Sequence, residues 1–159
     1  MKLTYDVVVE SSSGNSAEIV SSSDAVLTTY YPLVEDFISD ENLVENELNA
    51  IVNLFPNKPI HLLEVGFPTS NELGSSEKSQ QEFVCNIFKS WDTHKDEIKS
   101  VTFVWLYELS EETLTALAEL YGSSEPDFLN FLGSLGYLNF DKTTKRSFDV
   151  LVENIEKRR

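Results

Sequence analysis

Hydrophobic positions along this chain switch repeatedly between two kinds of pattern. Short continuous apolar runs, rich in β-branched and aromatic residues, predict buried strands. These runs occupy residues 2–9, 25–31, 60–64 and 101–107. Apolar residues three and four positions apart predict helices with one buried face. These stretches occupy residues 41–55, 83–91, 114–121 and 143–157, and two short helical additions are expected at residues 17–22 and 127–132.

The alternation of strands and helices predicts an α/β fold with a parallel sheet covered by helices. No linker divides the chain, so residues 1–159 are expected to form a single domain. Two architectures fit this order, a small doubly wound sheet and a part of an eight-stranded barrel. A complete barrel takes about 250 residues, so four βα units in a chain of 159 residues correspond to about half of one.

Composition narrows the classes of partner. The chain carries 27 acidic and 12 basic residues, a formal net charge of −15. Such a negative surface repels phosphate backbones and anionic lipids, so neither nucleic acid nor a membrane is expected as a partner. No apolar run approaches the length of about 18 residues that indicates a membrane span. A neutral ligand such as a sugar is compatible with this charge.

Cysteine and histidine give no sign of a metal or a cofactor. Cys85 is the only cysteine, which excludes an intrachain disulfide, and its apolar neighbours predict a small buried side chain. His61 and His94 lie too far apart in the sequence to form a recognisable zinc or iron motif with it. No glycine-rich pattern for a phosphate is present. We therefore expect no metal and no cofactor.

The first residues lack the apolar core and cleavage site of a signal peptide. Taken as written, the chain is expected to be cytoplasmic. If Met1 is an internal methionine of a longer protein, that parent protein could be secreted, and the compartment is then unknown.

The run at residues 60–64 ends in Glu64, and Gly66 and Pro68 follow it. A carboxylate at the carboxyl end of a parallel strand lies where barrel enzymes hold their reacting groups. Glycoside hydrolysis uses two carboxyl groups, one as nucleophile and one as proton donor. Glu64 is a candidate for the first role, and its alternative role is that of an exposed or helix-capping acid.

Three strand-end segments occur in order: Thr-Thr-Tyr-Tyr-Pro-Leu at 28–33, Leu-Glu-Val-Gly-Phe-Pro-Thr at 63–69 and Phe-Val-Trp-Leu-Tyr at 103–107. Together they resemble the second half of a clan A glycoside hydrolase, the (β/α)₈ group that includes the arabinogalactan endo-β-1,4-galactanases. The resemblance runs from about residue 3 to residue 153. It implies a partial TIM barrel of about four βα units, strands five to eight, with the helices on the outer face.

On this resemblance Glu64 matches the catalytic nucleophile. Tyr30 or Tyr31 matches the position that hydrogen-bonds the nucleophile, and Trp105 matches the aromatic platform under the sugar. The two tyrosines alternate across the sheet, so only one of them points into the barrel, and we favour Tyr31.

The chain departs from the family at the second carboxyl group. In the family the acid/base glutamate follows an asparagine at the end of strand four, which precedes the part that this chain matches. Asn46-Glu47 and Asn71-Glu72 fall in a predicted helix and a loop, and Glu108 is expected to be a solvated loop acid. Whether the chain is an enzyme therefore stays open, and any activity of the isolated chain is expected to be weak or absent.

Three functions fit these observations. The first is a half of a retaining β-glycoside hydrolase that acts on a polysaccharide. The second is a non-catalytic carbohydrate-binding remnant, and the third is a flavodoxin-like interaction domain. A half barrel would expose an apolar concave face and two open sheet edges, so we expect self-association or pairing with a missing N-terminal half. The expected ligand is an oligosaccharide or a polysaccharide.

Overall fold

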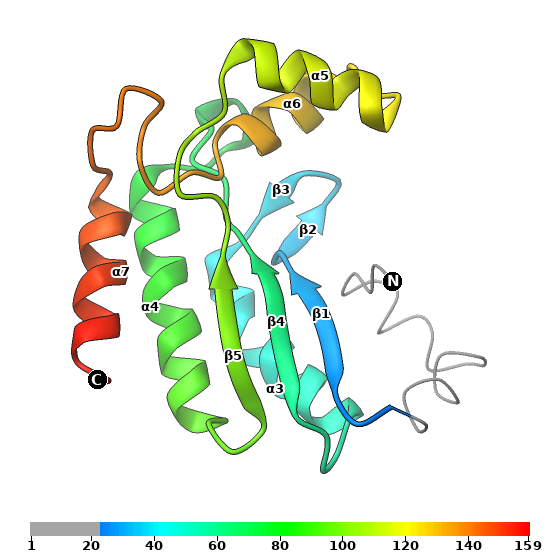
Figure 1. Ribbon diagram of the computed structural model, residues 1–159, viewed down its shortest axis with the longest axis vertical. Helices are drawn as coiled ribbons and strands as arrows, with labels where there is room; N and C mark the ends of the chain where they lie inside the picture. Colours follow the sequence, from blue (N-terminus) through cyan, green and yellow to red (C-terminus); the bar gives the residue numbers. More distant parts are fainter. Residues whose placement is uncertain (1–22) are drawn as a thin grey trace.

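The computed structural model describes residues 23–159, in which a parallel sheet carries helices on one face (Figure 1). Strands β1 (Val26–Tyr30), β4 (Ile60–Val65) and β5 (Ile98–Phe103) lie in the order β1-β4-β5, and both neighbouring pairs are parallel. This spatial order repeats the order along the chain, without the reversal that marks a doubly wound sheet. The expected strand at 2–9 and the helical piece at 17–22 lie outside the described residues.

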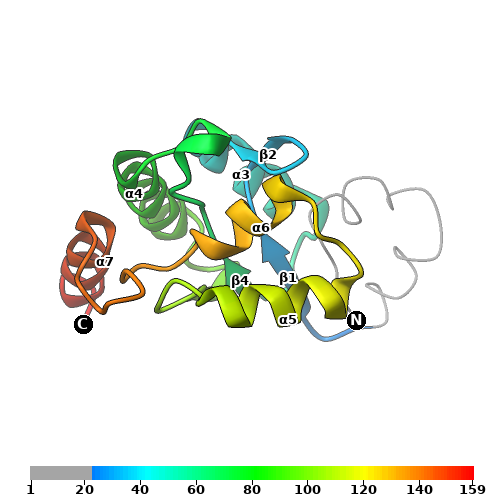
Figure 2. The same ribbon diagram turned by 90° about the horizontal axis from the view of Figure 1, so that it is seen from above.

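Two helices connect the strands and cover the same face of the sheet. Helix α3 (Val44–Leu54) follows a short 3₁₀ turn, η1 (Glu41–Leu43), and α4 (Glu77–Thr93) joins β4 to β5. The side chain of Ser76 caps α4 by accepting a hydrogen bond from the backbone N–H of Ser79. Helix α7 (Arg146–Glu156) packs beside α4, as both views show (Figures 1 and 2).

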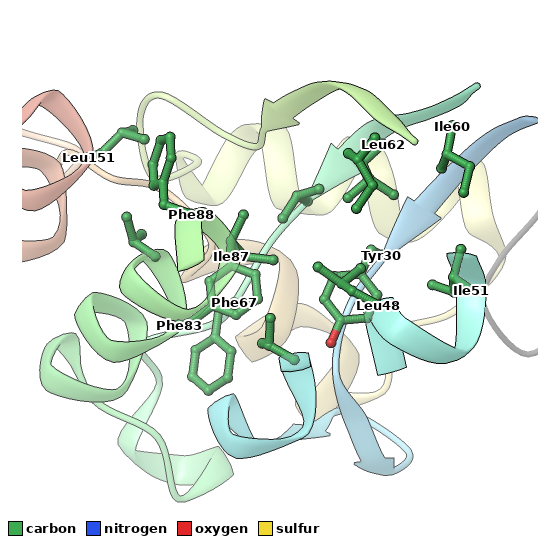
Figure 3. Close-up of a cluster of buried hydrophobic side chains, with 14 of the residues drawn as sticks. Tyr30, Leu48, Ile51, Ile60, Leu62, Phe67, Phe83, Ile87, Phe88 and Leu151 are labelled. Carbon is green, nitrogen blue, oxygen red and sulfur yellow. The ribbon is translucent and has the colours of Figure 1, made fainter. Parts of the chain in front are cut away.

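The main core lies between the sheet and helices α3, α4 and α7. Its large buried side chains include Tyr30, Leu48, Ile51, Ile60, Leu62, Phe67, Phe83, Ile87, Phe88 and Leu151 (Figure 3). Each large apolar side chain that is fully buried contributes about 1.5–3 kcal/mol. This core decides which residues of each strand face the helices.

The alternate strand positions lie on the opposite face of the sheet. There Leu27 and Leu63 are 49% and 43% exposed, and His61 Nδ1 lies 2.8 Å from Ser100 Oγ on the neighbouring strand. Among residues 23–159 no helix covers this face in the way that α3 and α4 cover the other (Figures 1 and 2). The sheet thus has one packed face and one apolar, accessible face.

The remaining elements gather over the carboxyl ends of the strands. They are the antiparallel pair β2 (Leu33–Glu35) and β3 (Ile38–Ser39), the 3₁₀ turn η2 (Asn71–Leu73), α5 (Glu111–Tyr121) and α6 (Pro126–Gly133). Figure 2, which looks down on the strand ends, shows α6 and α5 above them. A second, smaller apolar cluster around Leu73, Phe131 and Leu135 joins β2, η2 and α6.

The parallel α/β organisation predicted from the sequence is confirmed in the described residues, with three differences. The last strand begins at Ile98 and ends at Phe103, so Trp105 lies beyond it. The β2–β3 pair was not predicted, because Pro32 and the acidic residues after it are typical of a loop. The prediction of a buried Cys85 is wrong: the side chain is exposed, since helical geometry turns this position away from Phe83 and Ile87.

No helix in residues 23–159 combines the length and the apolar character that a membrane crossing requires.

Candidate functional site

Glu64 lies near the carboxyl end of β4, the central strand of the described sheet, and its side chain is exposed. The hydroxyl of Tyr31, which follows β1, donates to Glu64 Oε2 over 3.5 Å. This distance is longer than the 2.5–3.0 Å or so of a well-formed O–H···O bond. The carboxylate is therefore close to one donor and still open to others.

Gly66 allows Tyr31 to lie against the backbone that follows Glu64. A Cβ atom on Gly66 would lie 2.6 Å from Tyr31 Cε1 and 3.1 Å from Leu135 Cδ2. Real Cβ atoms do not approach other carbons as closely as the first of these distances, so a larger residue would displace the ring. The glycine after the strand end thus sets the position of the hydroxyl donor.

The surroundings of Tyr31 keep its hydroxyl protonated. Burial, followed by the charge of Glu64 and the hydrogen bond to it, raises the pKa of Tyr31 well above its ordinary value. A protonated phenol can donate, whereas a phenolate can only accept. Tyr31 therefore acts as a donor to Glu64 at any pH near neutrality.

Tyr30 lies on the other side of the sheet. It is fully buried, and its hydroxyl donates to Glu47 Oε2 on α3 over 2.9 Å. Its ring lies in the main core, 6.5 Å from the ring centroid of Phe83. Of the two tyrosines considered from the sequence, the structure brings only Tyr31 to Glu64.

Trp105 comes from the segment that follows β5. Its indole is partly buried and packs against the same small cluster as Tyr31. The backbone of this segment is fixed by two hydrogen bonds, from Tyr137 N–H to Trp105 O at 3.0 Å and from Leu138 N–H to Leu106 O at 2.8 Å. The Val104–Trp105 peptide bond is cis. Two of the aromatic residues considered from the sequence, Tyr31 and Trp105, therefore share one cluster at the strand ends.

Gly136 allows the segment at 136–138 to pair with the segment that follows β5. A Cβ atom on Gly136 would overlap the backbone N of Glu108 and the carbonyl carbon of Tyr107. The close approach of two backbones requires a residue without a side chain. The segment that carries Trp105 is therefore positioned by backbone contacts as well as by the indole.

Glu108 does not behave as the solvated loop acid that the sequence suggested. Its Oε1 lies 2.6 Å from Nζ of Lys145, whose side chain is only 1% exposed. Lys145 also donates to Thr69 Oγ1 over 2.9 Å. A buried ammonium group requires such partners, because its desolvation is costly. The ion pair therefore joins the loop after β5 to the residue before α7 and to the loop after β4.

A row of aromatic rings that was not predicted from the sequence extends from Tyr31. Ring centroids lie 5.4 Å apart for Tyr31 and Phe131, 5.7 Å for Phe131 and Phe37, 5.5 Å for Phe37 and Phe128, and 5.5 Å for Phe128 and Tyr121. We call these five residues the aromatic row. They come from four separate segments of the chain, so only the pair Phe128 and Phe131, three positions apart on α6, left a local signal.

The arrangement suits the binding of a sugar. An exposed carboxylate lies beside a hydroxyl donor, and Trp105 packs against the same apolar cluster as Tyr31. An indole can stack on the apolar face of a pyranose. No group of three or more His, Cys, Asp or Glu side chains in residues 23–159 is placed to hold a metal ion. The chemistry available at this edge is therefore that of a carboxylate, a hydroxyl donor and aromatic surfaces.

The chain matches no protein-family model and no curated protein sequence. It is similar in structure to glycoside hydrolases. A β-glucuronidase from Ruminococcus gnavus matches 86% of this chain and 22% of its own length, at 17% identity and a TM-score of 0.60. A GH2 β-galacturonidase from Eisenbergiella tayi bound to galacturonate matches 84% of this chain and 24% of its own, at 15% identity and a TM-score of 0.57.

A GH5_18 protein from Streptomyces cattleya in complex with GlcNAc matches 84% of this chain and 30% of its own length, at 15% identity and a TM-score of 0.54. The chain thus spans less than a third of each of these structures. At such low identity the similarity shows the fold: this chain is folded like a part of a glycoside hydrolase.

Proposed function

We propose that this chain is the C-terminal half of a retaining β-glycoside hydrolase barrel, with Glu64 as its nucleophile. The observation that carries the proposal is the exposed Glu64 carboxylate at the end of a central parallel strand, with the Tyr31 hydroxyl beside it. The fold shared with glycoside hydrolases and the resemblance of the three strand ends to clan A enzymes support it.

Each site residue then has a defined role. Ionised Glu64 attacks the anomeric carbon, the glycosidic bond breaks, and a covalent glycosyl-enzyme forms. Tyr31 donates its hydrogen bond to the carboxylate and holds it in one orientation. Trp105 offers an indole face on which the sugar ring stacks.

A second carboxyl group is required to protonate the leaving oxygen. In retaining enzymes it lies about 5–5.5 Å from the nucleophile. The candidate offered by the sequence, Glu108, is held in an ion pair with Lys145. We assign the acid/base role to a missing N-terminal half, and because acid–base help is worth about 10²–10⁴-fold, the isolated chain should hydrolyse ordinary glycosides very slowly.

The sheet has an edge and an apolar face that an N-terminal half could cover, which supports this assignment. Among the described residues β5 pairs only with β4, so no described strand pairs with its other edge. Leu27 and Leu63 are accessible on the face opposite the helices. A missing half that extends the sheet from β5 would cover both, and self-association is the alternative in its absence.

The substrate is proposed to be a neutral β-linked sugar. Solved structures of similar fold include a β-glucuronidase and a β-galacturonidase, which act on acidic sugars. This chain carries a net charge of −15, and its site residues are one acid and two aromatics. A uronate would be repelled at such a site, whereas a β-1,4-galactan would not.

The proposal is tested with a substrate whose leaving group needs no proton, so that the absence of an acid/base carboxyl group does not prevent the reaction. A 2,4-dinitrophenyl 2-deoxy-2-fluoro-β-glycoside releases dinitrophenolate, which departs with its electron pair and takes up no proton. Attack by Glu64 then leaves a stable glycosyl ester. Intact-mass spectrometry should show one added glycosyl group on the native chain and on the control E35Q, an exposed acid of β2, and none on E64Q.

Galacto-, gluco- and xylo-configured reagents are tested side by side. Labelling of E64Q to the same extent as the native chain would show that Glu64 is not the nucleophile. An unlabelled native chain that still binds oligosaccharides would favour the second candidate, a non-catalytic carbohydrate-binding protein. That candidate is favoured by one observation, the engagement of Glu108 with Lys145.

A further inference from the structure

The aromatic row ends at a residue that the proposed catalytic chemistry does not use. Tyr121 is the last residue of α5, and its side chain is 54% exposed. Gly122 follows in the left-handed conformation, with φ of 66°, and turns the chain back toward α6. The turn returns the chain from α5 to α6, and both helices lie above the carboxyl ends of the strands (Figure 2).

The ring is held by its neighbours while one part of it stays accessible. Tyr121 meets Phe128 at 82°, with the ring centroids 5.5 Å apart. Phe128 in turn packs on Phe37, and Phe37 packs on Phe131, which is 7% exposed. The edge-to-face contact with Phe128 favours one orientation of the Tyr121 ring, and the tilted contacts of Phe37 with Phe128 and Phe131 hold Phe128 in place. Tyr121 therefore presents a preformed aromatic surface rather than a freely rotating side chain.

The row leads directly to Glu64. Phe131 makes an edge contact with Tyr31, and the Tyr31 hydroxyl donates to Glu64. The charge of Tyr121 also raises the pKa of Tyr31, less than burial and Glu64 do, so the two phenols are electrostatically coupled. Tyr121 is thus linked to the carboxylate through a series of packed rings, of which Phe131 is buried.

We propose that Tyr121 is a second sugar-stacking position, which makes this site prefer an oligosaccharide to a single sugar. The inference rests on the proposed function, because it takes the sugar at Glu64 and Trp105 as the first unit. The next unit of a neutral β-linked chain would lie over Tyr121. An aromatic face packs against the C–H face of a pyranose, and the phenol hydroxyl can donate to or accept from a sugar hydroxyl.

The test compares affinities across chain length. The 159-residue chain is titrated by calorimetry with galacto-, cello- and xylo-oligosaccharides of one to four units. The affinity of the native chain for the preferred series should rise with length. Y121A should lose about three- to tenfold for the tetrasaccharide and little for the monosaccharide, since a well-placed aromatic contact is worth about that much.

The variant Y121F and the control variant F140A separate loss of stacking from damage to the fold. Y121F keeps the ring and should bind like the native chain, within about twofold. F140A removes a 64% exposed ring from the loop between α6 and α7 and should change nothing. Circular dichroism of each variant checks that the chain is folded. If Y121A binds the tetrasaccharide as tightly as the native chain, the inference is overturned.

W105A distinguishes this failure from a failure of the proposed function. Oligosaccharide binding that depends on Trp105 and not on Tyr121 overturns the second stacking position alone. A native chain that binds no oligosaccharide of any series overturns both the position at Tyr121 and the sugar site on which it depends.

Discussion

At the residue scale, the site depends on a small contact between Gly66 and Tyr31. The tyrosine ring occupies the space that any side chain at position 66 would need. The same ring carries the hydroxyl that donates to Glu64. Because Gly66 has no Cβ atom, the Tyr31 ring can lie where its hydroxyl reaches Glu64.

G66A should destabilise the protein by about 1–3 kcal/mol, because the new Cβ overlaps Tyr31 Cε1. Urea unfolding followed by circular dichroism measures the free energy of unfolding. The double variant G66A/Y31A should recover part of the loss, since the contact no longer exists. An equal cost of G66A with and without the Tyr31 ring would show that the ring does not occupy this space.

E64Q should lower the pKa of Tyr31, because the carboxylate charge and the hydrogen bond both help to keep the phenol protonated. Burial raises the pKa of Tyr31 most, so it should stay above the ordinary value even in E64Q. Ultraviolet absorbance during an alkaline titration measures tyrosine ionisation, and Y31F identifies the contribution of this residue. E35Q serves as the control, and an unchanged titration in E64Q would contradict the contact.

At the scale of elements, Lys145 joins three segments that are distant in sequence, through its ion pair with Glu108 and its hydrogen bond to Thr69. Lys145 precedes α7, Glu108 follows β5, and Thr69 follows β4. The loop after β5 also carries Trp105, so the ion pair fixes the segment on which the indole stands. The position of that segment is thus a property of packing between elements.

K145M should destabilise the protein by up to about 3 kcal/mol, because it leaves Glu108 without its cation in a partly buried place. K145M/E108L should recover part of this free energy. K89M is the matched control: its partner Glu45 and Lys89 are both exposed, so the cost should be about 0–1 kcal/mol. Equal unfolding midpoints for K145M and K89M would contradict a structural role of the buried pair.

The elements that the sequence predicted are those with a strong local pattern. Val44, Leu48 and Ile51 recur at helical spacing, and all three are buried in α3. Glu64 was predicted from its place at the end of a strand, whereas Tyr31 was predicted from the resemblance of its segment to clan A enzymes. The pairing of Glu108 with Lys145 was not predictable, because it links residues 37 positions apart through side chains alone.

At the scale of the whole molecule, one face of the sheet is packed and the other is accessible within residues 23–159. The apolar side chains on the accessible face favour association, while a net charge of −15 opposes the approach of a second copy. The balance between these two effects depends on ionic strength.

Self-association of the isolated chain should therefore increase with salt, since about 1 M salt shortens the Debye length to about 3 Å. Size-exclusion chromatography with light scattering at low and high salt measures the molar mass. L27D should reduce association by placing a charge on the accessible face, whereas L120D, on the exposed side of α5, should not. A native chain that is monomeric at every salt concentration would contradict this expectation.

The exposed position of Cys85 has a practical consequence. It is the only thiol in the chain, and it lies on α4, away from the strand ends that carry Glu64. A maleimide reagent would attach a fluorophore or a surface tether at this single place. Molecules immobilised through it would share one orientation, with the edge that carries the aromatic row left free to meet a soluble glycan.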